Sequence, residues 1–186
     1  MPAVLLAFFA CFAVVSVLPL GMLEAPDSHC LRAAIGWMEL GNPAEAEVEL
    51  NQIGPAGQKH PDVLELRWLL CAEQRNWEAG LQVARTLVEL APERSAGWLH
   101  RAYALRRVPG GGLEQAREAL LPAAGKFPKE ALIPFNLSCY ACQLGDLAGA
   151  LQWLKRALRA GGKAKVKLMA LADPDLQPLW PEVRKL

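Results

Sequence analysis

The sequence predicts an all-α fold built from repeated helix pairs. Its 186 residues include 62 Leu and Ala but only 15 Val, Ile and Thr, so helix formers far outnumber the β-branched residues that favour strands. A helical pattern also recurs along the chain at intervals of 34, 36 and 34 residues. These two observations argue against an all-β or a doubly wound fold. The formal net charge of +1 gives no global reason to expect a nucleic-acid partner.

Residues 1–23 form a separate apolar segment. From Ala3 to Leu23 there are 21 residues without a charge, which is enough for a helix to cross a bilayer. No basic residue precedes the segment and the nearest one downstream is Arg32, so the pattern of a signal peptide is poorly met and no orientation follows. Three interpretations stay open: a membrane anchor, a cleaved signal, or an unused start upstream of Met22. The odd count of five Cys favours reduced thiols, so we expect a cytoplasmic protein, membrane-tethered if residues 1–23 are translated and retained.

Residues 24–162 contain four repeated units. Each unit has a small residue where two helices would cross, and an apolar residue follows it four positions later on the same helical face. The small residues are Ala46, Gly80, Ala116 and Ala150, and the units begin near Asp27, Pro61, Ser95 and Ala131, which gives the ranges 27–60, 61–94, 95–130 and 131–162. An apolar stretch upstream in each unit predicts the first helix of the pair, at 34–40, 64–70, 98–105 and 135–144. A polar or Gly-containing turn separates the two predicted helices of each unit.

Residues 163–186 are predicted to close the last unit. Residues 163–172 form a short amphipathic helix that Asp173 and Pro174 end, and a helix at this point would cap the exposed apolar face of the final pair. The following segment, residues 173–180, is expected to fold back over the end of the repeats. Its apolar contacts would be Leu176, Leu179 and Trp180.

The repeated pattern resembles the tetratricopeptide repeat (TPR) family, in its bacterial type. That family has 34-residue helix–turn–helix units with small residues at the helix crossing, a Gly or small polar residue at the turn, and Pro at the end of the unit. Pro92 and Pro128 fit the pattern, whereas Gln58 replaces the closing Pro of unit one and Arg75 replaces the turn Gly of unit two. The resemblance implies an all-α solenoid of about four TPR-like repeats with a C-terminal capping helix.

The resemblance also implies a function. In this family the first helices of the units line a concave groove that binds an extended peptide or a partner helix. Transferred by position, the groove residues of the first two units would be Ser28, Leu31, Ile35, Met38, Glu39, Asp62, Glu65, Leu69, Ala72 and Glu73. The predicted partner-binding set over all four units is Glu65, Glu73, Leu99, Tyr103, Arg106, Arg107, Phe135, Asn136, Cys139 and Gln143. Tyr103 and Phe135 would be apolar anchors, and Arg106 and Arg107 would bind carboxylates. We therefore expect a non-enzymatic scaffold whose partner is another protein.

No pattern in the sequence predicts catalysis or a cofactor. The three His residues have no spacing that could hold a metal ion. Cys139 and Cys142 stand at i and i+3 on a predicted helix, so a thiol redox or metal-binding protein is the competing hypothesis. Because no second Cys pair exists and the pair lies mid-helix, small buried packing residues are the preferred interpretation.

Charge is distributed unevenly along the chain. Residues 24–93 carry 12 acidic and 5 basic residues, whereas residues 94–186 carry 7 acidic and 15 basic residues. One run of bases has no acid within it, and we call it the basic run: Lys155, Arg156, Arg159, Lys163, Lys165 and Lys167. It predicts a solvated face, an acidic or anionic-lipid partner, or head-to-tail self-association. A structural subunit of a membrane-associated complex is a further alternative.

Overall fold

The computed structural model describes residues 23–186, and the apolar segment predicted to anchor the chain lies almost entirely outside these described residues. The described part contains helices and no strand, which confirms the all-α prediction. Within it, no helix has both the length and the apolar character needed to cross a membrane. The residues fall into two compact units, residues 23–104 and residues 105–186, which are described separately below.

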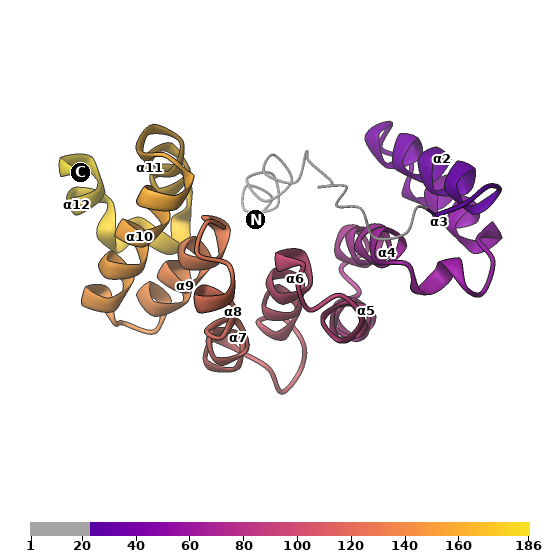
Figure 1. The fold of residues 1–186 in the computed structure, drawn as a ribbon. Helices are drawn as coiled ribbons and strands as arrows, with labels where there is room; N and C mark the ends of the chain where they lie inside the picture. The colour runs from indigo at the N-terminus through magenta and orange to yellow at the C-terminus, as the bar shows by residue number, and fades with distance from the viewer. Residues whose placement is uncertain (1–22) are drawn as a thin grey trace. The chain divides into compact units, whose positions relative to one another are not determined.

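The first compact unit consists of helix pairs (Figure 1). Helices α2 and α3 pack together, as do α4 and α5, and α3 also contacts α4. The helices of this unit are α2 (Asp27–Glu39), α3 (Pro43–Gln52), α4 (Pro61–Glu73), α5 (Trp77–Leu90) and α6 (Ser95–Leu105), with a short 3₁₀ turn η1 (Gly57–Lys59) between α3 and α4. The last residue of α6, Leu105, already belongs to the second compact unit.

The second compact unit contains the last helix pair and the C-terminal segment. Helices α9 and α10 make the most extensive contact, and α11 packs on α10 as the predicted capping helix. The elements are α7 (Leu113–Leu120), α8 (Ala123–Lys126), α9 (Leu132–Gln143), α10 (Leu147–Gly161), α11 (Lys163–Ala172), the 3₁₀ segment η2 (Pro174–Leu179) and α12 (Trp180–Lys185).

Small residues stand at the helix crossings, as the repeat pattern predicts. Ala46, Ala116 and Ala150 have no exposed surface, and Gly80 is buried. A Cβ atom on Gly80 would lie 3.4 Å from the Cβ of Cys71, which is ordinary van der Waals contact. Larger side chains at the Ala positions would have to displace the facing helix, at a cost of about 1–3 kcal/mol.

The turns of the first, second and last helix pairs share one local structure. A residue with positive φ comes first, and an Asn or Asp follows whose side chain accepts a backbone N–H from the first turn of the next helix. Gly41 and Gly145 adopt the positive φ in the first and last pairs, and Arg75 adopts it at φ 56° in the second. The departure at Arg75 therefore changes the residue but not the backbone conformation of the turn.

The C-terminal segment, residues 173–186, folds back over α9, as predicted. Leu176 and Leu179 are buried in one cluster with residues of α9 and α10, and the indole N–H of Trp180 donates to the carbonyl of Ala170 at 3.0 Å. Val183 of α12 is also fully buried. The end of the repeats is thus covered by the chain itself.

Candidate functional site

The predicted groove positions in residues 23–104 differ in how accessible they are. Glu73 ends α4 and Glu39 ends α2, and both are exposed. Partly buried apolar side chains of the same two helices pack on one core cluster, namely Ile35, Met38 and Leu69. These acidic and apolar side chains, together with half-buried Ser28, are accessible positions of the predicted set in this compact unit.

Glu65 is held by an internal ion pair. The Arg94 side chain is only 4% exposed, and its Nη1 donates to Glu65 Oε1 at 3.0 Å and also to a carboxylate oxygen of Asp62. Burial raises the pKa of Glu65, and the hydrogen bond from Arg94 partly opposes that rise. The ion pair therefore ties Arg94, at the end of the second repeat, to Glu65 on α4, and the Glu65 carboxylate is already bound within the chain.

Tyr103 and Leu99 lie in the interior. Each is 5% exposed, and the Tyr103 ring packs edge-on against Trp68 at 5.8 Å and tilted against Trp77 at 5.7 Å between ring centroids. The Tyr103 ring therefore packs within its own unit, so the structure does not present it as the exposed anchor that counting positions suggested.

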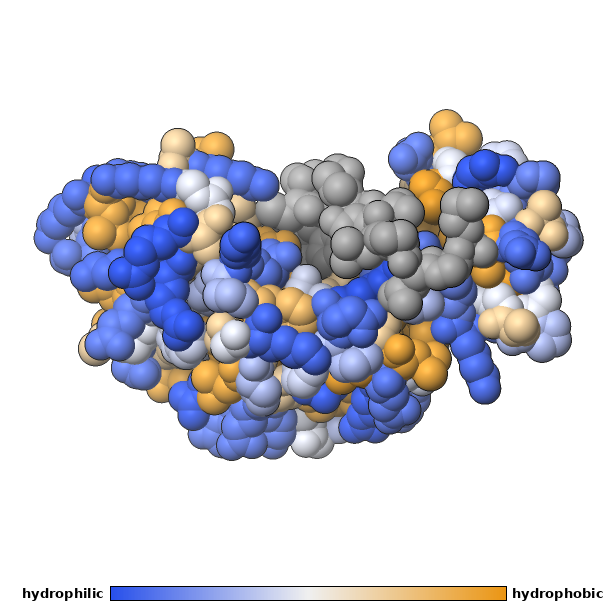
Figure 2. Space-filling view, in the orientation of Figure 1, coloured by the Kyte–Doolittle hydropathy of each residue, from blue (hydrophilic) through white to orange (hydrophobic). Residues whose placement is uncertain are grey.

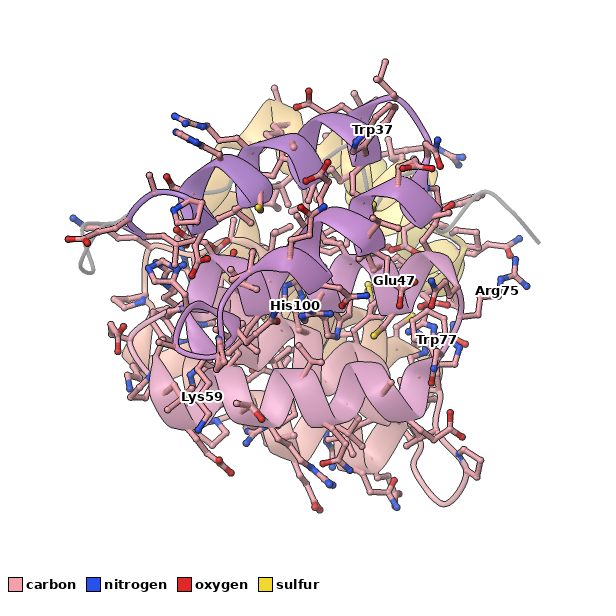
Figure 3. The ribbon with its side chains drawn as sticks, turned by 90° about the vertical axis from the view of Figure 1, so that its right-hand side faces the viewer. Trp37, Glu47, Lys59, Arg75, Trp77 and His100 are labelled. Atoms are coloured by element: carbon pink, nitrogen blue, oxygen red, sulfur yellow. The ribbon has the colours of Figure 1, made fainter. Side chains whose placement is uncertain are left out.

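His100 belongs to the same aromatic cluster. Its ring is 1% exposed and stacks on Trp68 with centroids 3.8 Å apart and planes at 9°. Figure 3 shows His100 near the middle of the view and Arg75 at the right-hand side. Burial lowers the pKa of His100 to about 3, so the imidazole is neutral at physiological pH. It acts as an aromatic packing residue.

Arg106 binds a carboxylate, but the carboxylate belongs to the chain. Its Nη2 donates to Asp175 Oδ1 at 3.1 Å, and its Nη1 donates to the other oxygen of the same group. Asp175 lies in η2, 69 residues further along the chain. This fork-to-fork geometry is the strong form of the interaction. Arg106 therefore binds a carboxylate, as predicted, but the carboxylate is that of Asp175 and not of a partner protein.

Three predicted groove residues on α9 also contact the C-terminal segment. Gln143 donates from Nε2 to the backbone carbonyl of Asp175 at 2.9 Å, and the Cys139 thiol donates to Asp173 Oδ2 at 3.6 Å. Phe135, 7% exposed, shares a buried cluster with Leu176. The segment from Asp173 to Leu179 thus lies along α9 and contacts the positions at which a partner peptide was expected.

Two predicted residues of the second compact unit are not placed against that segment. Asn136 donates from Nδ2 to the carbonyl of Leu132, one turn earlier in its own helix, at 2.8 Å. Arg107 is half-buried. Neither observation assigns an outside partner to these side chains.

The Cys139 and Cys142 pair has the character of packing residues. Both are buried, and burial raises the pKa of the Cys139 thiol well above its usual range, with Asp173 and Asp175 raising it further. Burial raises the pKa of Cys142 as well. One ligand atom each from Cys139, Asp173 and Asp175 could meet within 4.8 Å, but the thiolate that a metal or redox site needs is disfavoured and Arg106 already balances Asp175. The redox and metal hypotheses are not favoured.

The basic run lies on α10 and α11. Five of its six residues are exposed, and the sixth, Lys167, donates from Nζ to the carbonyl of Arg184 at 2.9 Å. The Arg156 guanidinium stands 4.4 Å from the centroid of the Trp153 ring, which fixes one end of the run. Figure 2 shows hydrophilic side chains projecting over this part of the molecule, at the left of the view.

Two interacting residues were missed by the sequence analysis. Arg94 and Asp175 lie outside the predicted groove set, and each pairs with a member of it. A signal existed for Asp175, because it is one of only two acids between Lys155 and Trp180. Spacing along the chain carries no information about which base it would meet.

Part of the chain is similar in sequence to a curated TPR protein. No protein-family model matches the chain. Over 93 residues it is 32% identical to tetratricopeptide repeat protein 36 of Bos taurus, a match that covers 48% of this chain and 49% of that protein. The chain therefore matches about half the length of this curated relative.

Several solved structures have a similar fold. TTC0263, a thermophilic TPR protein of Thermus thermophilus, superposes with a TM-score of 0.61 at 18% identity, covering 86% of this chain and 95% of that chain. The MamA RS-1 ArsTM double mutant gives a TM-score of 0.65 at 12% identity, covering 88% and 96%. A structure of Naa15/Naa10 bound to HypK-THB gives 0.57 at 19% identity, covering 86% of this chain but 24% of that chain. At these identities the likeness establishes the fold.

Proposed function

We propose that this chain, a TPR-type helical repeat protein, is a non-enzymatic scaffold that binds a peptide or helix of a partner protein along the first helices of its repeats. The observation that carries the proposal is the C-terminal segment on α9. Arg106 binds the carboxylate of Asp175 in that segment, and Gln143 binds the backbone of the same residue. Leu176 of the segment is buried in one cluster with Phe135 of α9. These are the elements of peptide recognition in a helical groove.

Within this proposal the partner binds on residues 23–104 instead of on α9. Release of the C-terminal segment would expose Leu176, Leu179 and Val183, each worth about 1.5–3 kcal/mol of burial. That cost makes α9 a poor site for an external peptide. The accessible predicted positions on α2 and α4 are Glu39 and Glu73 with Ile35, Met38 and Leu69.

The chemistry of this surface supports a basic, apolar-centred partner segment. Two exposed carboxylates favour Lys or Arg, and the partly buried apolar side chains favour an aliphatic or aromatic anchor between those bases. We therefore expect a partner segment with an apolar residue flanked by basic residues.

Affinity capture from the native cell extract tests the proposal. The full chain, its Glu39→Lys, Glu73→Lys variant, and a Glu89→Lys, Glu93→Lys control are compared. The control changes the net charge by the same amount on exposed side chains of α5 and the loop after it.

The expected result is a protein retained by the parent and the control but lost by the groove variant. Crosslinking from a benzophenone side chain at Leu69, with Glu89 as the matched position, then locates the contact. Equal retention by all three proteins, or crosslinking from Glu89 alone, contradicts groove binding at α2 and α4.

A further inference from the structure

Two helices of the chain carry the same apolar pattern with opposite charge. In α3 the sequence from Glu45 to Leu50 reads Glu-Ala-Glu-Val-Glu-Leu, and in α11 the sequence from Lys163 to Leu168 reads Lys-Ala-Lys-Val-Lys-Leu. Helix α3 contains no basic residue and α11 contains no acidic residue. The two helices are therefore electrostatic counterparts of similar length.

Each helix leaves one large apolar side chain exposed within its charges. Helix α3 buries Ala46 and Leu50, which leaves Val48 at 53% exposure. Glu45 lies three positions before it, on the same helical face. Glu47, the residue before Val48, is also exposed. We call Glu45, Glu47 and Val48 the acidic α3 face.

Helix α11 has the complementary arrangement. It buries Val166 and Ala170, so its outward side carries Leu168 at 71% exposure. Lys165 lies three positions before Leu168, and both it and Lys163 are exposed. We call Lys163, Lys165 and Leu168 the basic α11 face, in which Lys165 and Leu168 share one side of the helix and Lys163 flanks them at its first residue.

The charge of each compact unit has the same sign as its face. Residues 23–104 contain 12 acidic and 7 basic residues, and residues 105–186 contain 7 acidic and 13 basic residues. The hydrogen bond to Glu47 comes from a neutral side chain, Gln74 Nε2, at 3.2 Å, so it leaves the charge of that carboxylate uncompensated. An acidic surface of this kind attracts the basic surface of a second copy at long range.

We propose that the acidic α3 face of one copy docks on the basic α11 face of a second copy. The contact pairs Val48 with Leu168 at its centre and surrounds them with Glu–Lys pairs. Because the two faces differ, the contact is heterologous, and each copy keeps one free face for a further neighbour. The assembly grows head to tail and weakens as salt screens the charges.

Charge exchange tests the proposal without the need for an outside ligand. Two differently tagged full-length copies are mixed, and capture on one tag measures the fraction of the other that is retained. Variant one is Glu45→Lys, Glu47→Lys and variant two is Lys163→Glu, Lys165→Glu, all at exposed positions. Each variant alone opposes like charges. A mixture restores opposite charges, because the altered α3 face of variant one meets the altered α11 face of variant two, and the unaltered α11 face of variant one meets the unaltered α3 face of variant two.

The parent is expected to self-capture at low salt, and each variant alone to lose about tenfold or more of that signal. The mixture is expected to recover it. Matched controls with the same change in net charge, Glu89→Lys, Glu93→Lys and Lys126→Glu, Lys129→Glu, change exposed residues outside the two faces and should self-capture like the parent. Far-UV circular dichroism verifies that all variants are folded.

Three outcomes overturn the proposal. Self-capture that no variant reduces places association elsewhere in the chain. A loss in both variants that mixing does not restore shows that the two faces do not meet each other. A variant two that self-captures normally but no longer binds vesicles containing anionic lipid assigns the basic α11 face to a membrane surface instead.

Discussion

Burial of His100 makes the stability of the fold dependent on pH. Its ring has 1% exposure and stacks on Trp68, and burial lowers its pKa from 6.5 to about 3. The unfolded chain takes up a proton near pH 6.5 but the folded chain does not, so acid favours the unfolded state. The stabilisation is complete above pH 6.5 and is lost progressively as the pH falls toward 3.

The size of the effect follows from the pKa difference. Each pH unit below 6.5 costs about 1.4 kcal/mol, so at pH 5 the free energy of unfolding is lower by about 2 kcal/mol from this residue. Urea unfolding followed by circular dichroism, at about pH 7.5 and about pH 5, measures it. His100→Gln is expected to remove the loss, whatever its own cost in stability.

A control separates this residue from other titrating groups. His29 on α2 is exposed, so His29→Gln should lose the same free energy as the parent between the two pH values. Glu65, whose pKa burial raises, contributes with the opposite sign but does so equally in all three proteins. If parent and His100→Gln lose stability equally, the reasoning about His100 is refuted.

Three further predictions concern single side chains. Arg75→Gly is expected to stabilise the chain by about 1 kcal/mol, seen as a rise in Tm of about 2–4 °C, because glycine adopts the positive φ of that turn without a Cβ clash. Leu176→Ala, at a position with no exposed surface, should lower the free energy of unfolding by about 2–5 kcal/mol in urea titration. Cys139 should react with iodoacetamide at least about tenfold more slowly than half-exposed Cys30 until the chain is unfolded, and fast native alkylation would contradict its buried, protonated state.

The repeat architecture could be predicted because its signals are local. Helix formers, small residues at the crossings and turn residues each act within a few positions, and the helix pairs with their structural neighbours confirm the TPR-type resemblance. Even the irregular turn at Arg75 fits, since an Asn follows it and caps the next helix as in the neighbouring pairs. The capping helix at Lys163–Ala172 was found for the same reason.

The candidate site was less predictable because it depends on how deeply each side chain is buried and on ion pairs between residues far apart in the sequence. Counting positions assigned Tyr103 to a helix face but could not show that Trp68 and Trp77 pack against its ring. It selected Arg106 as a carboxylate ligand without identifying Asp175, since an ion pair across 69 residues leaves no local pattern. The chemistry of the side chain was predicted, and its partner was not.

The covered end of the repeats also limits how such a chain can lengthen over evolutionary time. Leu176, Leu179 and Val183 fill the surface on which another helix pair would otherwise stack. A gene duplication that placed a repeat directly after α12 would leave the new pair without an apolar neighbour. Duplications inserted before α9 keep this covering segment in place, so we expect homologues of different length to share it and to vary upstream of it.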